Sequence, residues 1–403
     1  MTGSQTSGAG PLAGIRVLEL GTLIAAPFAA RILGDFGAEI IKVESLDGDP
    51  LRNWRVLHNG TSLWWHLQSR NKKSISVDLK SQKGVDIVKQ LAAQADIVIE
   101  NFRPGGLEKL GLGWADLSAV NPNLVMVRIS GFGQTGPYRD RPGFGAIGEA
   151  MGGIRHTTGA PDQAPARAGI SLGDSLASLH GVIGALMGVV HVKSGLGKGQ
   201  VVDVSLFESV FNLMEGIVPE YDLYGIARER SGGRLPGISP SNTYKTRDGA
   251  WLVIAGNGDA IFKRLMTAIG RSDLASDVRL RNNEGRVAHE ELIDQAIDRW
   301  AAQYDIDEAC ALLNDAEVPN GRIYTVADIV SDPQYQARDM ILRDSLPDGT
   351  EVRMPGITPK FSETPGKVRW LGQDMGFHTS AVLQDMGFDE GQIAALKTDG
   401  VVR

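Results

Sequence analysis

The sequence predicts an α/β fold in which a parallel sheet is covered by helices. Short apolar runs alternate along the chain with stretches whose apolar residues recur at helical spacing. The 403 residues are 42% hydrophobic, enough to bury one large core or two moderate cores. Glycine, at 50 residues, exceeds its usual share of about 7%, which indicates many tight turns. Because strands that alternate with helices pair in parallel, a sheet with helices on both faces is expected.

The first half of the chain carries this alternation from its start. A strand at residues 15–20 is followed by a helix with one apolar face, and a second strand at 39–44 completes a β-α-β unit. The helix face consists of Phe28, Ile32, Leu33 and Phe36. Further strands are expected at residues 74–79, 97–100, 124–129 and 201–205, and further helices at 85–95, 114–120 and 175–192 and through Met214.

The helix expected at residues 175–192 has no charged residue. Its apolar side chains recur at helical spacing, but it also contains Ser, His and Gly residues. We therefore expect a buried core helix and not a membrane span.

A change of composition marks the second half of the chain. Residues 225–240 are rich in Gly, Arg, Ser and Pro without an apolar period, which indicates a linker between domains. We expect a large domain at 10–215, a small domain at 225–325 and a C-terminal part at 326–403. Within the small domain, strands are expected at 251–255 and 321–325 and helices at 262–269 and 292–304; short strands after Met340 and a helix at 392–397 follow.

The charge and cysteine content exclude several partners. Lys and Arg number 41 against 48 Asp and Glu, so the net charge of −7 provides no general attraction for nucleic acid or an anionic membrane. The single cysteine, Cys310, cannot form an internal disulfide, which suits a reducing compartment. Residues 1–10 lack the features of a signal peptide and are expected to form a frayed tail. A cytoplasmic protein is therefore expected.

One glycine motif matches a dinucleotide-binding fingerprint in its letters but not in its context. Gly131, Gly133 and Gly136 follow a strand, but Pro137 and Pro142 stand where a helix should open to bind pyrophosphate. No phosphate loop or paired-histidine metal motif is present in the sequence. Neither a nicotinamide or flavin cofactor nor a metal ion is therefore expected.

Two serine-hydrolase patterns overlap in residues 169–176. Gly-Ile-Ser171-Leu-Gly fits a nucleophile elbow, and Gly-Asp-Ser175-Leu fits an esterase block. An elbow needs an apolar strand before its serine, whereas residues 163–168 contain Pro and Arg. A serine hydrolase or thioesterase that uses Ser171 or Ser175 remains the alternative.

Asp174 is the other candidate in this segment. It stands at the expected start of the helix, where free backbone N–H groups and the helix dipole favour negative charge. From spacing alone, a simple helix cap is the favoured explanation of Asp174.

Several blocks in order resemble the class III CoA-transferases, the family that includes formyl-CoA and carnitine CoA-transferases. The resemblance extends over nearly the whole chain, from about Leu12 to Lys397, and rests on the order and spacing of the blocks. They are Leu12-Ala-Gly-Ile-Arg-Val-Leu-Glu-Leu20, Gly37-Ala-Glu-Ile-Ile-Lys-Val-Glu44, Gly48-Asp49 with Arg52 and Trp54, Arg70-Asn-Lys-Lys-Ser74, Glu100-Asn-Phe-Arg-Pro-Gly105, Gly131-Phe-Gly-Gln-Thr-Gly-Pro137 and Gly173-Asp174.

The resemblance implies a covalent mechanism on Asp174. The carboxylate would attack an acyl-CoA thioester to form a mixed anhydride, and CoA thiolate would convert the anhydride into an aspartyl-CoA thioester that the acceptor carboxylate opens. No prosthetic group is required, because coenzyme A enters as a thioester substrate. The family fold implied is a Rossmann-like large domain built from both ends of the chain, so that residues 326–403 return to it, with a smaller inserted α/β domain, in an interlocked homodimer.

The resemblance also implies positions for the ligand-binding residues. Gly256, Asn257 and Gly258 match a glycine loop that covers the active site and offers N–H groups to an oxyanion; a plain strand-to-helix turn is the alternative. The residues matched to the coenzyme A site are Ile24, Ala25, Ser45, Val77, Asp78, Leu79, Lys80, Asn101, Phe102, Arg103, Lys109 and Arg141; Lys80, Lys109 and Arg141 are equally compatible with an ordinary solvated surface.

At several positions the sequence differs from other members of the family that it resembles, and these differences concern the residues expected to select the substrate. Ile24 replaces a glutamine of formyl-CoA transferases, and Phe144-Gly145 replaces both their Tyr-Glu pair and the histidine of 2-methylacyl-CoA racemases. Residues 219–222, 236–242 and 257–264 resemble members that use succinyl-CoA with C4 to C6 dicarboxylates of the malate, citramalate, mesaconate, itaconate or hydroxymethylglutarate type. Candidates to bind the remote carboxylate of such an acid are Arg52, Arg141, Arg167, Ser241 and Asn242.

Overall fold

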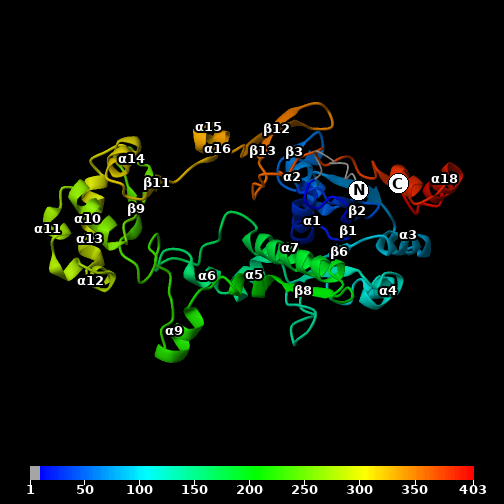
Figure 1. The fold of residues 1–403 in the computed structure, drawn as a ribbon, viewed down its shortest axis with the longest axis horizontal. Coiled ribbons are helices and arrows are strands. Elements are labelled where there is room, and N and C mark those ends of the chain that lie inside the picture. The colour runs from blue at the N-terminus through cyan, green and yellow to red at the C-terminus, as the bar shows by residue number, and fades with distance from the viewer. Residues whose placement is uncertain (1–9) are drawn as a thin grey trace, which may run out of the picture. The chain divides into compact units, whose positions relative to one another are not determined.

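Residues 10–403 are described by the computed structural model of the protein (Figure 1). They form two compact units. Unit 1 comprises residues 10–154, 168–215 and 337–403, and unit 2 comprises residues 155–167 and 216–336. The tail expected at residues 1–10 lies outside the described residues except for Gly10. The finer domain boundaries expected at 10–215, 225–325 and 326–403 stay a prediction.

Unit 1 is built on a six-stranded sheet, and each pair of neighbouring strands is parallel. The parallel α/β sheet predicted from the sequence is thereby confirmed. Its strand order is β5-β2-β1-β6-β7-β8, so the chain first extends the sheet on one side of β1 and then crosses back to the other side. The strands are β1 (Arg16–Glu19), β2 (Glu39–Glu44), β5 (Lys72–Ser76), β6 (Ile97–Glu100), β7 (Val125–Ser130) and β8 (Val201–Ser205).

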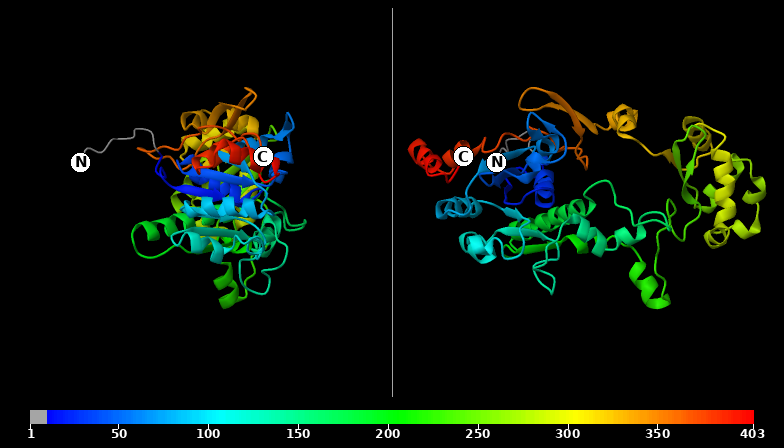
Figure 2. Two further views of the ribbon diagram at one scale, coloured as in Figure 1. Left: turned by 90° about the vertical axis from the view of Figure 1, so that its right-hand side faces the viewer. Right: turned by 180° about the vertical axis from the view of Figure 1, so that it is seen from behind.

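The side chains of the central strands pack into two separate hydrophobic cores, one on each face of the sheet, because successive side chains of a strand point to opposite faces. Val17 packs with helices α1 (Ala25–Asp35) and α7 (Leu172–Lys193) on one face. Leu18 packs on the other face with α3 (Gln82–Ala93), α4 (Trp114–Val120), α17 (Thr379–Asp385) and α18 (Glu390–Thr398). Figures 1 and 2 show the C-terminal helix α18, in red, beside α3, although the two are far apart in the sequence.

The core helix expected at residues 175–192 is α7, and it is buried on one face only. Its Ala177, Val182 and Val189 face is buried against the sheet and α1, but Met187 and Val190 on the opposite face are exposed. The sequence did not predict this one-sided packing, because the helix is apolar on all sides and has no polar face that would indicate which side is exposed to solvent. By length and composition alone, α7 is apolar enough to cross a membrane, but it packs on a sheet here.

Two strands differ from those expected by more than one residue at an end. β5 begins at Lys72 and ends at Ser76, not at residue 79, because Asp78 N–H donates to the carbonyl of Val401 and Val77 forms a bridge with Val402. The chain end therefore takes over the hydrogen bonds that a longer strand would have needed. In unit 2 the strand expected at 321–325 is β11 (Asn320–Arg322), and the chain then leaves the sheet.

The remaining elements of unit 1 are short and border the main sheet. They are η1 (Pro50–Asn53), β3 (Leu57–His58), β4 (Thr61–Ser62), α2 (Leu63–Gln68), η2 (Glu108–Leu110), α5 (Gly145–Met151), α8 (Leu206–Phe211) and the hairpin β12 (Ile341–Ser345) and β13 (Glu351–Pro355). Helices α6 (Ile154–Thr157) and α16 (Pro333–Ala337) cross a boundary between the units in the sequence.

Unit 2 has a core of its own around an antiparallel sheet of order β11-β10-β9. β9 (Ser241–Lys245) was not expected, since its sequence Ser-Asn-Thr-Tyr-Lys carries a single buried side chain, Tyr244. Residues 225–240 contain no helix or strand. The other elements are α9 (Ile217–Tyr224), β10 (Trp251–Ala255), α10 (Asp259–Ala268), α11 (Ser272–Ala275), η3 (Val278–Leu280), α12 (Asn283–Ala288), α13 (Glu290–Ala301), α14 (Ile306–Asp315) and α15 (Val326–Ser331).

Candidate active site

The carboxyl ends of the parallel strands bring distant sequence segments to one edge of the unit 1 sheet. The loops after β5, β2, β1 and β6 leave from four neighbouring strands. In open α/β sheets, ligands bind at this edge, where the strand order reverses. The reversal here lies between β1 and β6, because the chain continues from β1 to one side of the sheet and from β6 to the other.

A pair of hydrogen bonds joins the two loops at the point of reversal. The side-chain oxygen of Asn101 accepts from Thr22 N–H at 2.8 Å, and its amide nitrogen donates to the Thr22 carbonyl at 2.9 Å. A Cβ built on Gly21 would lie 2.7 Å from the Asn101 oxygen, so this close approach requires glycine. Asn101 therefore fixes the path of the β1 loop just before α1 begins.

Two buried lysines lie beneath the same loops. Lys42 and Lys72 are almost fully buried, and their Nζ atoms lie 2.8 Å and 2.7 Å from the two carboxylate oxygens of Glu19. Burial, together with the charge of Lys42, lowers the pKa of Lys72 to about 8. Burial also disfavours the charge of Lys42, but three surrounding carboxylates outweigh it and raise the pKa of Lys42 above its ordinary value.

Asp49 connects this buried charge to two loops. Its carboxylate lies 2.9 Å from Lys42 Nζ and accepts hydrogen bonds from Leu23 N–H at 3.1 Å and Leu51 N–H at 2.9 Å. Leu23 has a φ of 64°, a left-handed conformation that a leucine adopts only when its surroundings impose it. The Asp49 carboxylate thus holds a strained residue immediately before the N-terminus of α1.

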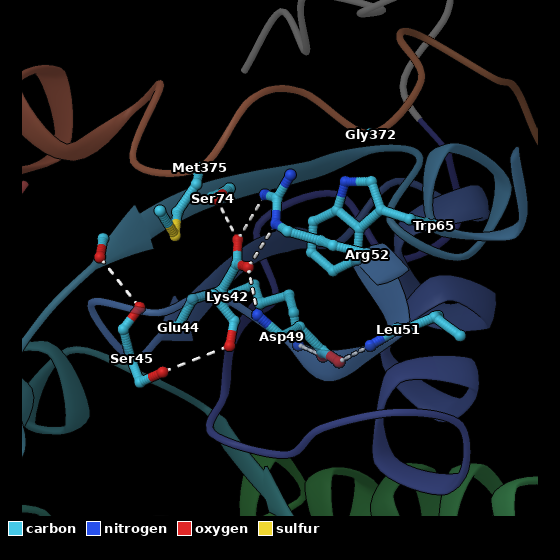
Figure 3. Close-up of polar contacts among 12 residues, drawn as sticks. Lys42, Glu44, Ser45, Asp49, Leu51, Arg52, Trp65, Ser74, Gly372 and Met375 are labelled. Atoms are coloured by element: carbon cyan, nitrogen blue, oxygen red, sulfur yellow. Dashed lines mark hydrogen bonds and ion pairs between the residues drawn. The ribbon is translucent and has the colours of Figure 1, made fainter. Parts of the chain in front are cut away.

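Arg52 of η1 is held by the buried carboxylate of Glu44, the last residue of β2 (Figure 3). Its guanidinium donates to both oxygens of Glu44 at 2.8 Å and stacks over the Trp65 ring at 3.8 Å. Glu44 also accepts from Asp49 N–H at 2.9 Å and from the Ser74 hydroxyl. These bonds pair Nε and Nη2 and so orient the guanidinium; binding of a substrate carboxylate by Arg52 stays a prediction.

A second ion-pair network supports the loop after β6. Arg128 donates to Glu100 at 2.7 Å and to Glu108 of η2 at 2.7 Å, and Glu100 accepts from Phe102 N–H at 2.7 Å. The buried Arg128 side chain therefore links the segment that contains Asn101 and Arg103 to the short helix that contains Lys109.

Asp174 lies in the first turn of α7, close to the start of α1. Ser178, one turn further along α7, donates from its hydroxyl to the carbonyl of Ala25 at 2.7 Å. A Cβ built on Gly145 would overlap the Asp174 carboxylate, so only glycine at position 145 leaves this carboxylate its space. Gly145 was not recognised as important from the sequence beyond its difference from relatives.

The alternative nucleophiles do not have the surroundings of a serine hydrolase. Ser175 donates to the Ser171 carbonyl at 2.9 Å, and within residues 10–403 no recorded hydrogen bond joins either hydroxyl to a histidine. Residues 158–170 contain no strand, so Ser171 does not follow the strand of a nucleophile elbow.

In the glycine motif at residues 131–136, the two N–H groups of Gly133 and Gln134 are occupied. Gly133 N–H donates to the Ser130 hydroxyl at 3.0 Å, and Gln134 N–H donates to the Asp203 carboxylate at 2.9 Å. The next helix begins only at Gly145. These N–H groups are therefore not presented to a pyrophosphate as the dinucleotide fingerprint requires.

Most residues expected to bind coenzyme A converge on the loops at this edge of the sheet. Ile24 and Ala25 are buried at the start of α1, and Ser76 donates from its hydroxyl to the Ser45 carbonyl at 3.1 Å. The exposed cations among them are Lys80, Arg103, Lys109 and Arg141. The guanidinium of Arg141 stacks on the Tyr138 ring at 3.7 Å. Of the other expected residues, Val77 is buried, and four are half-buried: Asp78, Leu79, Asn101 and Phe102.

Unit 2 contains the remaining candidates. Gly256, Asn257 and Gly258 form the turn between β10 and α10, and Ser241 and Asn242 begin β9. The Asn242 amide donates to the Asp294 carboxylate at 2.9 Å and is thus engaged within the unit. Arg167 is exposed.

The buried charges Glu19, Lys42, Asp49 and Lys72 were not recognised as a group from the sequence. The available signal was a charged residue inside a strand that is otherwise apolar, as in Glu-Ile-Ile-Lys42-Val-Glu. Such a residue is almost never fully buried unless it is paired, so each one predicts a buried partner. Which carboxylate pairs with which lysine depends on strand register.

Comparison with known proteins identifies relatives over nearly the full chain. The family model described as CoA-transferase family III matches residues 12–379. The succinyl-CoA–D-citramalate CoA-transferase of Chloroflexus aurantiacus is 48% identical over 97% of this chain and 98% of its own length. The succinyl-CoA–L-malate CoA-transferase beta subunit of the same organism is 40% identical over 97% of this chain and 98% of its own length.

Solved structures share the fold. A CAIB/BAIF family protein from Brucella suis has a TM-score of 0.82 and 34% sequence identity, covering 94% of this chain and 100% of that chain. The similarity in fold thus extends over both units of the chain.

Proposed function

The chain belongs to CoA-transferase family III and is a class III CoA-transferase, and from this premise we propose that it moves CoA from succinyl-CoA to a C4 to C6 dicarboxylic acid. The acceptor would be of the malate, citramalate, mesaconate, itaconate or hydroxymethylglutarate type. The 48% identity with a succinyl-CoA–D-citramalate CoA-transferase over 97% of the chain supports this substrate class.

We propose Asp174 as the covalent nucleophile. The observation that carries this proposal is the position of its carboxylate in the first turn of α7, next to Gly145 and beside the start of α1 at the carboxyl edge of the sheet. Asp174 is the acidic residue in that first turn, and the helix dipole there favours its ionised, nucleophilic form.

The proposed reaction needs no net proton transfer. An oxygen of Asp174 attacks the thioester carbonyl, the C–S bond breaks, and an aspartyl anhydride and CoA thiolate result. The thiolate attacks the aspartyl carbonyl and displaces succinate, which leaves an aspartyl-CoA thioester. The acceptor carboxylate then displaces the thiolate to form a second anhydride, and attack of the thiolate on the acyl carbonyl of the acceptor releases the product thioester and restores Asp174.

We propose that the loops at the edge of the sheet bind the CoA thioester. The exposed cations Arg103, Lys80, Lys109 and Arg141 suit its phosphates, which prefer charge-assisted hydrogen bonds. The described residues 10–403 contain no cluster of three or more His, Cys, Asp or Glu side chains that could hold a metal ion. The proposed chemistry uses CoA as substrate and draws on no prosthetic group.

We further propose an interlocked homodimer in the cytoplasm. α9 buries no residue within the described chain, and its Leu223 and Tyr224 are 70% and 76% exposed. The outer face of α7 is likewise apolar and exposed at Met187 and Val190. Surfaces of this kind favour contact with a second copy of the chain. The need for CoA thioesters and the single cysteine suit the cytoplasm.

Mass spectrometry of the protein after incubation with succinyl-CoA tests the proposal. Hydroxylamine or borohydride should modify Asp174 only after incubation, and Asp174→Asn should show no modification and no CoA transfer. Transfer that persists in Asp174→Asn would overturn the assignment of the nucleophile. Equal rates with monocarboxylate acceptors would overturn the dicarboxylate specificity, and a monomer mass in light scattering would overturn the dimer.

A further inference from the structure

Glu149 is a buried carboxylate of unit 1 that lies outside every block that identified the family. It belongs to α5 and stands four residues after Gly145, so the two residues share one face of this helix. Only 1% of Glu149 is exposed. A carboxylate is rarely buried to this extent unless it is hydrogen-bonded or paired, so the groups that it contacts indicate what it holds in place.

The face of α5 that carries Gly145 and Glu149 contacts the first turn of α7, which contains Asp174 (Figure 1). Both helices belong to unit 1. A Cβ built on Gly173 would lie 2.8 Å from the Gly145 carbonyl oxygen and 3.3 Å from Glu149 Cγ. The two helices can approach this closely beside Asp174 because residues 145 and 173 are both glycines.

Glu149 supplies a hydrogen bond that caps α7. Its Oε1 accepts from Gly173 N–H at 3.3 Å. Gly173 is the second residue of α7, and the N–H at this position usually donates to the side chain of the residue just before the helix. That residue is Ser171, and within residues 10–403 its hydroxyl accepts no recorded hydrogen bond from α7. A carboxylate from a neighbouring helix therefore replaces the local cap.

Ser178 holds the same turn from the other side. Its buried hydroxyl lies 2.7 Å from the Asp174 carbonyl and 2.7 Å from the Ala25 carbonyl at the start of α1. The backbone at Asp174 is thus connected to α5 through the preceding residue and to α1 through its own carbonyl. These contacts with two packed helices fix the direction in which the Asp174 side chain leaves the backbone.

We propose that Glu149 is a positioning residue for CoA transfer, which caps α7 at Gly173 and so fixes the direction in which the Asp174 carboxylate extends. This inference rests on the proposed function, in which Asp174 is the nucleophile. In this role Glu149 forms no bond to the substrate and transfers no proton, and it acts only through the backbone of Gly173 and Asp174.

Two substitutions of Glu149 separate the reach of its side chain from its charge. Glu149→Gln keeps an oxygen at the same distance that can accept from Gly173 N–H, although the charge is lost. Glu149→Asp keeps the charge, but its carboxylate is one methylene group closer to α5. Because a nucleophile displaced by about 1 Å can react about 100-fold more slowly, we expect kcat to fall about 100-fold in Glu149→Asp and at most about threefold in Glu149→Gln.

The rate at which succinyl-CoA modifies Asp174 is the direct measurement. Rapid quenching followed by mass spectrometry gives this rate without an acceptor acid, and it should fall in Glu149→Asp by the same factor as kcat. KM for succinyl-CoA should change by less than about threefold, because the cap acts on the attack and not on binding. Thermal melts establish that each variant is folded.

Ser205 provides the matched control in the same unit. It is also buried, and its hydroxyl caps α8 by accepting from Glu208 N–H at 3.3 Å. Ser205→Ala should lower the melting temperature but leave the rate of Asp174 modification at the wild-type value. An equal slowing in Ser205→Ala, or a rate in folded Glu149→Asp that matches or exceeds that of Glu149→Gln, would overturn the inference alone. A wild-type protein in which succinyl-CoA does not modify Asp174 would overturn the proposed nucleophile together with it.

Discussion

The carboxyl edge of the unit 1 sheet and the glycine loop of unit 2 are both held by buried cations, but the partners of these cations differ. In unit 1, Lys42 and Lys72 pair with Glu19 and Asp49, which are themselves buried. In unit 2, Arg286 mainly binds neutral carbonyls, and its one carboxylate partner, Asp259, is 64% exposed.

This difference teaches two ways to fix a loop. At the sheet edge, opposite charges neutralise each other and hold Leu23 in a strained conformation, so the removal of one charge leaves another buried without a partner. At the glycine loop, a guanidinium fixes the direction of a peptide group, and the loss of its carboxylate partner leaves no buried anion. The stability of the sheet edge should therefore depend on the charges of its buried residues, and that of the glycine loop on the positions of the Arg286 donors.

Substituting Lys42 should have the largest effect on stability. Lys42→Met leaves Asp49 buried without a cation, whereas Glu19 keeps its ion pair with Lys72, and we expect the free energy of unfolding to fall by about 3–5 kcal/mol. Urea denaturation at pH 7 measures the loss. The matched change in unit 2, Asp259→Asn, should cost less than about 1 kcal/mol because Asp259 is exposed.

Two outcomes would break this comparison. Equal losses for Lys42→Met and Asp259→Asn would show that burial of the carboxylate does not separate the two regions. Lys73→Met serves as a control within unit 1, because Lys73 pairs with Glu39 at 2.6 Å near the surface. If Lys73→Met lowered the free energy of unfolding as much as Lys42→Met, position in the sheet and not burial would decide the effect.

Substituting Arg52 should have an intermediate effect and also tests its predicted role in substrate binding. Arg52→Met removes the cation from buried Glu44, which keeps its hydrogen bonds from Asp49 N–H and Ser74, and we expect a loss of about 2–3 kcal/mol. If Arg52 acts only on the loop, KM values for dicarboxylate and monocarboxylate acceptors should change in parallel.

Steady-state kinetics with both acceptor classes separate the two roles. A rise in KM confined to dicarboxylates would show that Arg52 binds the remote carboxylate. Arg55→Met is the control, because Arg55 lies over the Trp64 ring at 4.8 Å and is exposed, so it should change neither stability nor KM appreciably.

The smallest expected effect is the pH dependence of the free energy of unfolding that comes from the titration of Asp49 at the sheet edge. Burial favours the neutral form of Asp49, but Lys42 and backbone N–H groups outweigh burial and lower its pKa below the ordinary 3.8. A depressed folded-state pKa contributes stability above the unfolded pKa, and this stability is lost as pH falls through the folded pKa. The difference in unfolding free energy between wild type and Asp49→Asn should therefore be constant between about pH 5 and 6, well below the pKa of Lys72, and shrink below about pH 4.

Lys42→Met should change the direction in which the pKa of Asp49 is shifted, and with it the pH dependence of the free energy of unfolding. Without the lysine, burial raises the pKa of Asp49, so the deficit of Lys42→Met relative to wild type should narrow as the pH falls from 7 toward 4. Urea denaturation across that range reports both differences. A deficit that stays constant on acidification would show that Asp49 finds another partner in the variant.

The strand and helix pattern of unit 1 was predictable because each strand is an apolar run and each helix has a regular period. The strands at 39–44, 97–100 and 201–205 were predicted with their observed bounds. Elements without a hydrophobic period could not be predicted in this way, as β9 shows. The exposed face of α7 was also missed, because a uniformly apolar helix does not reveal which side is covered.

The sequence by itself determined the fold class and the family, since both depend on local periodicity and on the order of short blocks along the chain. It also pointed to Asp174 and to the loops now found at the carboxyl edge of the sheet. Only the tertiary structure decided which charges pair, because Glu19, Lys42 and Lys72 meet through strand register. The same holds for Arg286, whose contact with Asn257 bridges 29 residues. Contacts between residues far apart in the sequence depend on packing in three dimensions, which no local pattern records.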